Sequence, residues 1–111
     1  MAGTTFLVVR SVLSDPSLRE RFDHWYATDH LPRAVAGLGA EKGWRLWSET
    51  EANVHYAVYR FADAGRLKHG MGSAPFKALV VDYDRTWPAG VTRTREILTL
   101  AEALVPRFRS S

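Results

Sequence analysis

Hydrophobic and polar side chains alternate along four segments of the chain, which is the pattern of β-strands with a buried face. These segments span residues 4–12, 41–50, 53–61 and 91–100. In the first segment both alternating sets are largely apolar, which predicts a strand covered on both sides. Only Glu51 and Ala52 separate the second segment from the third, so we expect these two to form an antiparallel hairpin.

Between the first two strands, apolar residues recur at the spacing of an amphipathic helix. Asp15 and Pro16 suit the N-cap and the first position of this helix. Its apolar face carries Leu18, Phe22, Trp25 and Tyr26. Pro32 disfavours helical geometry at the residue before it, so the helix is expected to end or kink near His30, with a further short turn over residues 34–38.

A second helix is predicted between the third and fourth strands. Ser73 is a suitable N-cap, and Pro88 and Gly90 end the helix. Its apolar stripe consists of Phe76, Leu79, Val80, Tyr83 and Trp87. Residues 62–72, which precede this helix, are expected to be a connector with one short helical turn around residues 64–69.

The element order is therefore β-α-β-β-α-β, which predicts an α+β, ferredoxin-like fold: a four-stranded antiparallel sheet with two helices on one face. The other face then exposes apolar residues such as Phe6 and Val8. Because such a patch is unusual on a monomer, we expect a homodimer, packed sheet against sheet. Residues 1–111 are expected to form one domain that ends in a frayed tail, residues 101–111.

Composition narrows the class of protein. With 46% hydrophobic and 24% charged residues in 111, the chain has the make-up of a single globular domain. No apolar run is long enough to span a membrane, and the N-terminus lacks the layout of a signal peptide. The absence of cysteine excludes disulfides and thiol chemistry, which makes the cytoplasm the expected compartment. The net charge of +3 is scattered and no RNA-binding motif is present, so no nucleic-acid partner is expected.

The segment from His24 to Pro32 is the densest cluster of aromatic and ionisable side chains in the chain. His30 is its most interesting member, because an imidazole titrates near neutrality and can take or give a proton. His24 and His30 are six residues apart, which is about 240° around a helix, so they cannot share a metal ion there. The sequence also lacks the spacings of zinc and calcium sites, and no metal is expected.

The pattern Trp25…His30-Leu31-Pro32, together with residues 82–87 (DYDRTW) and the element order, resembles the dimeric α+β barrel superfamily and, within it, the EthD-like domains. The resemblance covers roughly residues 4–100. One position departs from it: EthD domains place a Trp four residues before the His, where this chain has Tyr26. The resemblance implies a homodimeric α+β barrel with a pocket between helices and sheet. Some proteins of this kind act on a small organic compound without a cofactor.

Carried over to this chain, the resemblance makes His30 the catalytic acid or base. Tyr26, one helical turn earlier, is a candidate to donate a hydrogen bond to an enolate-like oxygen. The further candidates for contact with the ligand are Trp25, Asp29, Trp47 and His55. Trp44 and Trp47 lie on opposite faces of one strand, so at most one of them lines a given pocket. His55 is expected to reach the open face of the sheet.

Each of these residues also has a purely structural interpretation. A His at a helix end often bonds the last carbonyls, and the spacing of Trp25 and Tyr26 is already explained by core packing. Two classes of function therefore stay open. One is a cofactor-independent enzyme of monooxygenase, cyclase or lyase type that acts on a small hydrophobic or aromatic compound. The other is a domain that binds a small ligand without catalysis or only dimerises. Convergence of His30, Tyr26 and a third polar group on one cavity would favour the enzyme.

Overall fold

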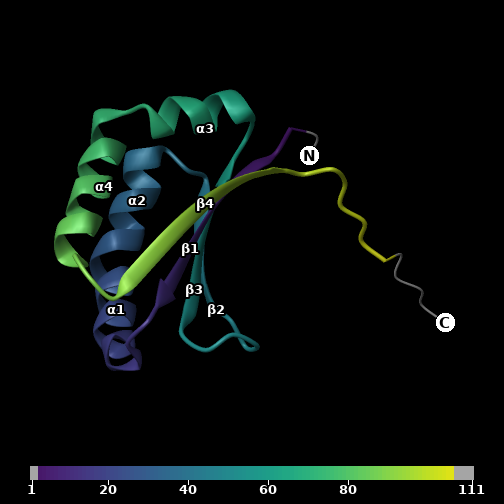
Figure 1. Cartoon of the computed structure of the whole chain (residues 1–111). Coiled ribbons are helices and arrows are strands. Elements are labelled where there is room, and N and C mark those ends of the chain that lie inside the picture. The colour runs from purple at the N-terminus through teal and green to yellow at the C-terminus, as the bar shows by residue number, and fades with distance from the viewer. Residues whose placement is uncertain (1–2, 107–111) are drawn as a thin grey trace.

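The computed structural model describes residues 3–106 and contains a four-stranded antiparallel sheet with helices on one face (Figure 1). The strands are β1 (Thr5–Leu13), β2 (Lys42–Trp47), β3 (Val54–Phe61) and β4 (Val91–Thr99). They are ordered β2-β3-β1-β4, so β1 and β3 are central while β2 and β4 form the two edges. This is the predicted ferredoxin-like arrangement, with the hairpin and all four strands where the alternation placed them.

The helical segments follow one another in two groups. They are η1 (Pro16–Leu18), α1 (Arg19–Trp25), η2 (Tyr26–His30), α2 (Leu31–Leu38), α3 (Ala64–Met71) and α4 (Ala74–Thr86). The first four form one helical run after Asp15, whose carboxylate accepts a hydrogen bond from the Ser17 amide at 2.9 Å. Figure 1 shows α1, α2 and α4 on the same side of the sheet and α3 across one end.

The first helical run does not end near His30, which corrects one of the two predicted outcomes, but its regular α-helical geometry is interrupted there. Its middle part, η2, is a π-helical turn that closes when the amide of Leu31 donates to the carbonyl of Tyr26. Pro32 then falls in the first turn of α2, where its missing N–H costs little. The helical run continues to Gly39, whose positive φ of 67° ends it in a left-handed cap.

The connector before α4 is more helical than expected, because residues 64–71 form the whole of α3 rather than a single turn. The carboxylate of Asp63 caps this helix by accepting from the Arg66 amide at 2.8 Å. Gly70 lets α3 lie against the end of α2, since a Cβ there would overlap the carbonyl oxygen of Leu38. Ser73 caps α4 as predicted, accepting from the Phe76 amide at 3.3 Å.

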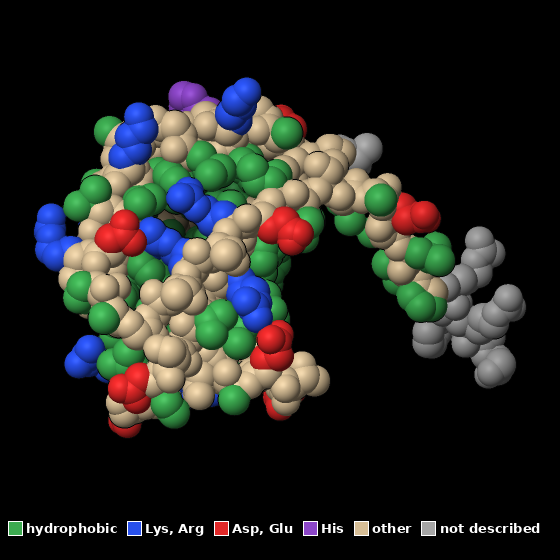
Figure 2. Space-filling view, viewed as in Figure 1, with side chains coloured by type: hydrophobic (Ala, Val, Ile, Leu, Met, Phe, Trp, Pro, Cys, Tyr) green, Lys and Arg blue, Asp and Glu red, His purple; other side chains and the backbone are tan. Residues whose placement is uncertain are grey.

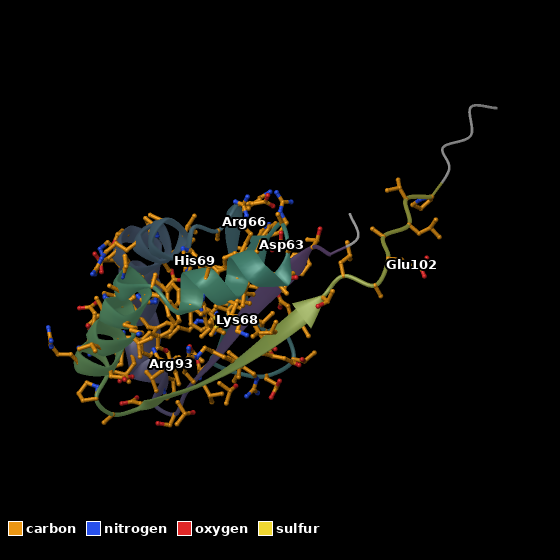
Figure 3. All side chains as sticks on the ribbon, turned by 90° about the horizontal axis from the view of Figure 1, so that it is seen from above. Asp63, Arg66, Lys68, His69, Arg93 and Glu102 are labelled. Atoms are coloured by element: carbon orange, nitrogen blue, oxygen red, sulfur yellow. The ribbon has the colours of Figure 1, made fainter. Side chains whose placement is uncertain are left out.

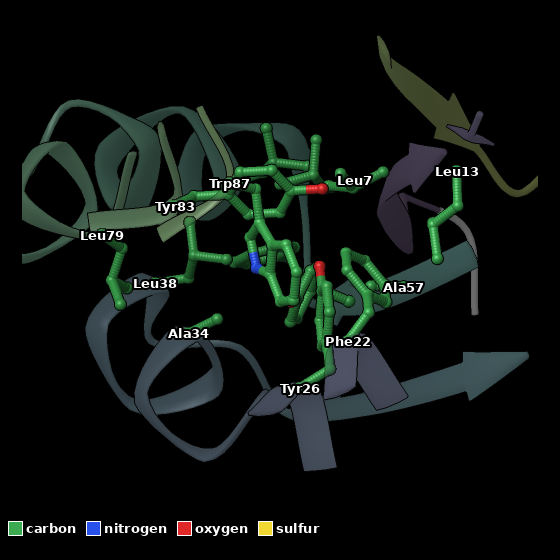
Figure 4. Packing of buried hydrophobic residues seen from close by; sticks show 14 residues of the cluster. Leu7, Leu13, Phe22, Tyr26, Ala34, Leu38, Ala57, Leu79, Tyr83 and Trp87 are labelled. Atoms are coloured by element: carbon green, nitrogen blue, oxygen red, sulfur yellow. The ribbon is translucent and has the colours of Figure 1, made fainter. Parts of the chain in front are cut away.

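The core lies between the helices and one face of the sheet (Figure 4). Alternate residues of the two central strands enter it, among them Leu7 and Tyr59, which are paired across β1 and β3. The helices contribute large aromatic side chains, including Phe22 and Tyr83. His55 shares this face, with 0% of its surface exposed, so the expectation that it reaches the open face is wrong.

The opposite face of the sheet has no helix over it among residues 3–106. Phe6, Val8, Tyr56 and Val58 stay partly exposed there, together with Trp44, so Trp44 and Trp47 do lie on opposite faces. Residues 101–106 form no helix or strand and run away from the sheet, while the rest of the expected tail lies outside the described residues (Figure 1). Of the helices described, none is long and apolar enough to cross a membrane.

Candidate functional site

A cavity lies between the helices and the β4 side of the sheet. About 390 Å³ of it is unfilled when the space open to solvent is included, and about 30 Å³ is accessible to the centre of a water molecule. The apolar part of its wall consists of Leu7, Val9, Ala34, Leu38, Phe76, Leu79 and Val80. The polar part consists of Tyr26, His30, Tyr59, Tyr83, Arg93 and Arg95. An apolar cavity with a few convergent polar groups is the usual form of a small-molecule site.

One wall is supplied by the first helical run at intervals of four residues: Tyr26, His30, Ala34 and Leu38. In a regular α-helix, residues four apart drift around the axis by about 40° at each step, so four such residues would not share a face well. The wider turn at η2 changes the angle around the helix axis between the first residues of this series. The two sequence-predicted catalytic residues are therefore the first two members of the cavity wall.

His30 is 7% exposed, and its ring stacks on that of Trp25 with a centroid distance of 4.6 Å and an interplanar angle of 22°. Its Nδ1 is buried and forms no hydrogen bond with the described residues, so it is not tied to the helix-end carbonyls. Burial, and after it the charge of Arg93, lowers the pKa of His30 from 6.5 to about 4. The imidazole is therefore neutral near pH 7 and able to accept a proton.

Three tyrosines line the same cavity, and the rings of Tyr26 and Tyr83 lie 4.8 and 5.5 Å from the ring of His30. The hydroxyl of Tyr26 is buried without a hydrogen bond of good geometry, and burial raises its pKa well above 10. Burial also raises the pKa of Tyr59 to about 12. Tyr83 shares a 2.8 Å hydrogen bond with the hydroxyl of Ser11, and its pKa is raised by burial as well. All three are protonated near pH 7, so each can donate a hydrogen bond to an oxygen in the cavity.

Two arginines from β4 complete the polar wall, and the sequence analysis did not single them out. β4 is paired with β1 in the sheet. Arg93 and Arg95 therefore lie on the same face of the sheet as the β1 residues that line the cavity. Figure 3 shows Arg93 between β4 and α4, well away from Arg66 on α3. Figure 2 shows basic side chains beside hydrophobic ones in a hollow next to β4. The alternation of side chains along β4 could have indicated these two arginines, because Arg93 and Arg95 share a face with Val91 and Ile97.

His55 and Trp47 lie beside the cavity without lining it. The ring of His55 packs against Tyr26 at 4.5 Å, and its Nε2 accepts a hydrogen bond from Arg45 at 3.2 Å. Arg45 is also paired with Asp23, which accepts a 2.9 Å hydrogen bond from the indole of Trp47. Burial, followed by the charge of Arg45, lowers the pKa of His55 to about 3. These residues support Tyr26 from behind.

The remaining candidates are placed differently from one another. Trp25 backs the cavity through its stacking on His30, although it does not line the cavity itself. Asp29 is ion-paired with Arg33 at 3.1 Å, outside the cavity wall, and Arg33 also reaches Asp82 at 3.3 Å. Within residues 3–106, no cluster of three or more His, Cys, Asp or Glu side chains is arranged to hold a metal ion.

Solved structures share this fold. The oxygenase SnoaB from Streptomyces nogalater, described as cofactor-independent, superposes with a TM-score of 0.65 at 14% identity, covering 96% of this chain and all (100%) of its own. A candidate antibiotic biosynthesis monooxygenase from Caulobacter crescentus gives 0.66 at 22% identity, covering 91% and 92%. An ethyl tert-butyl ether D (EthD) family protein from Bacillus halodurans gives 0.61 at 17% identity, covering 82% and 96%. No protein-family model and no curated protein matches the sequence.

These likenesses define the class of the fold: the chain has the α+β architecture of the proteins that include antibiotic biosynthesis monooxygenases and EthD proteins. The resemblance found in the sequence is thereby confirmed at the level of the fold. At identities of 14–22%, the similarity carries the architecture and not the activity.

Proposed function

We propose that the chain is a cofactor-independent enzyme that acts on a small, flat, hydrophobic compound in this cavity, with His30 as the general base and Tyr26 as a hydrogen-bond donor. The observation that carries the proposal is the convergence of His30, Tyr26 and Arg93 on one cavity. A His that served only the helix end would be bonded to backbone carbonyls, whereas the Nδ1 of His30 has no such partner.

The proposed first step is a proton transfer. A C–H or O–H bond of the substrate breaks, the proton moves to an imidazole nitrogen of His30, and the electron pair stays on the substrate as an enolate or phenolate. A pKa of about 4 makes His30 a weak base in the empty cavity. The negative charge that develops on the substrate favours the imidazolium, so the base strengthens as the reaction proceeds. Tyr26 donates a hydrogen bond to the developing oxyanion in this proposal.

Anthrone is a suitable probe because it is a flat aromatic ketone with an acidic CH₂ group. With dioxygen as co-substrate, one anthrone and one O₂ give one anthraquinone and one water, which absorbance and oxygen uptake both report. Under argon in D₂O, exchange of the CH₂ hydrogens reports proton abstraction alone. We expect the protein to accelerate at least the exchange, and His30→Gln to slow it by on the order of 100-fold.

His24→Gln is the matched control, because His24 is an exposed histidine on the same helical run and does not line the cavity. It should exchange and turn over anthrone like the wild type, and circular dichroism should show that both variants are folded. Saturable binding of anthrone without exchange or turnover would favour the other class of function, a protein that binds a small ligand without catalysis. Mass spectrometry of the compound carried by the protein from its native host would then identify that ligand.

We also propose that the chain acts as a homodimer through the open face of the sheet. The support is the apolar surface around Phe6, Trp44 and Tyr56, together with Leu46 and Leu98, which are 50% and 44% exposed. Surface of this kind on a small domain normally marks an interface. Light scattering coupled to size exclusion should give twice the chain mass at micromolar concentration, and the mass of one chain would reject the dimer.

A further inference from the structure

The charged side chains that line the cavity, among the described residues, are both positive. Both residues that β4 contributes are arginines, and none of the lining residues is an acid. His30 is neutral near pH 7 and the tyrosines are protonated, so these groups leave the arginine charges uncompensated within the wall. The cavity therefore has two positive charges on its β4 side, and one of them, on Arg93, is paired with Asp84 outside the wall.

The guanidinium of Arg93 is held in a definite orientation. It stacks over the ring of Tyr83 at 3.8 Å, and that ring is itself fixed by the hydrogen bond to Ser11. The side chain is only 16% exposed, and its Nη2 donates to Asp84 at 2.9 Å, on a carboxylate that is 68% exposed. Its Nε and Nη1 donate to no other described residue, so one edge of the fork is free for a ligand.

Arg95 stands two residues further along the same face of β4. Its guanidinium lies 5.5 Å from the ring centroid of Phe76, and it forms no ion pair with the residues described. Residues two apart on a strand are separated by about 7 Å, which is a span that one carboxylate or one pair of oxygens can bridge. Arg93 is thus the oriented donor and Arg95 is the more exposed charge beside it.

We propose that the cavity selects an anionic aromatic ligand, with a flat ring system against its apolar wall and an ionised carboxylate or phenolate oxygen between Arg93 and Arg95. The inference deepens the proposed function, because it names the substrate class of the same site. An anion loses its hydration when it enters such a cavity, and charge-assisted hydrogen bonds from the arginine fork offset that loss. A neutral ligand of the same shape gains no such compensation.

Naphthoate and naphthamide test this directly, because they have the same ring system and differ in charge. Titration calorimetry of the wild type should give a dissociation constant at least about 10-fold lower for naphthoate. Arg93→Met keeps an apolar side chain over Tyr83 and removes the charge, so it should abolish most of that preference. Arg93→Lys should retain part of it, since the charge remains without the fork. Arg95→Met removes the second charge. Because Arg95 is exposed, this substitution should not impair folding.

Arg66→Met is the matched control, since Arg66 is an exposed arginine on α3 outside the cavity (Figure 3). It should bind both probes as the wild type does. Three results would each overturn the inference. The first is equal binding of the two probes, and the second is no saturable binding of naphthoate at millimolar concentration. The third is a preference for naphthoate that survives when Arg93→Met is combined with Arg95→Met. Anthrone exchange that depends on His30, with no preference for naphthoate, would reject the anion site and keep the proposed enzyme. A preference for naphthoate without anthrone exchange would keep the anion site and reject the proposed enzyme.

Discussion

The helix-facing side of the sheet is filled near β3 and hollow near β4. In the filled half, Phe22 is 0% exposed and has six aromatic rings with centroids 5.2–6.4 Å away. In the hollow half, no residue of β4 is fully buried, and arginines take two of the positions that face the helices, between Val91 and Ile97. We therefore expect the filled half to contribute most to stability, while the hollow half holds the proposed ligand site, and each half can be perturbed by itself.

The largest expected effect comes from Phe22→Ala. Removing a fully buried ring from the filled half leaves a cavity, and the free energy of unfolding should fall by about 3–5 kcal/mol. Phe76→Ala is the counterpart in the hollow half, where the ring borders space that is already unfilled, and it should cost less than about 2 kcal/mol. Urea unfolding followed by circular dichroism measures both. Equal losses would mean that the two halves are packed alike.

The next effect is a loss of stability in acid, with one buried histidine contributing from each half. The folded-state pKa is lowered from 6.5 to about 4 for His30 and to about 3 for His55. Because the unfolded chain binds protons at higher pH than the folded chain, the stability is present above pH 6.5 and is lost as the pH falls towards 4. Each histidine should account for roughly 2–3 kcal/mol over that range.

Unfolding curves at a series of pH values test this expectation. His30→Gln and His55→Gln should each flatten the slope of unfolding free energy against pH by about one proton. His24→Gln, at an exposed position on the same helical run, is the matched control. A slope unchanged in both buried variants would show that neither imidazole is held neutral by the fold.

The smallest effect concerns the ion pairs of the two halves. Asp23 is paired with Arg45 and also accepts from Trp47, so Asp23→Asn should cost about 1 kcal/mol. Asp84, on the hollow side, pairs with Arg93 from an exposed position, and Asp84→Asn should cost about 0.3 kcal/mol. Thermal unfolding at low and moderate salt compares them. A larger cost for Asp84→Asn would reverse the assignment of stability to the filled half.

The strands, the hairpin and the order of elements could be predicted from the sequence because each follows a local period of two or of three to four residues. The continuation of the helix beyond Pro32 could not, since it depends on the π-helical turn at residues 26–30, which no local pattern announces. The alternation of side chains along β3 also could not predict which face of this strand lies against the helices. Both faces of that strand are largely apolar, so only the packed structure shows that His55 faces the helices.

The cavity wall could be predicted in part. His30 and Tyr26 were singled out because they lie in a dense aromatic cluster and because the resemblance implies a role for His30, and the structure places both in the cavity wall. The arginines of β4 were missed because β4 is distant in sequence from that cluster and meets it only through its pairing with β1. Asp29 was proposed from proximity in sequence, but its neighbour on the helix surface is Arg33 and not the cavity.

The position of β4 at the edge of the sheet has a consequence for motion. Within residues 3–106, β4 is hydrogen-bonded to a strand on one side only, and its side chains are the least buried of the four strands. Segments of this kind open locally at a lower free energy than a central strand such as β3. The wall that carries Arg93 and Arg95 is therefore also the wall that fluctuates most easily. We expect the rate of ligand exchange to follow the breathing of this edge, while the filled half stays closed.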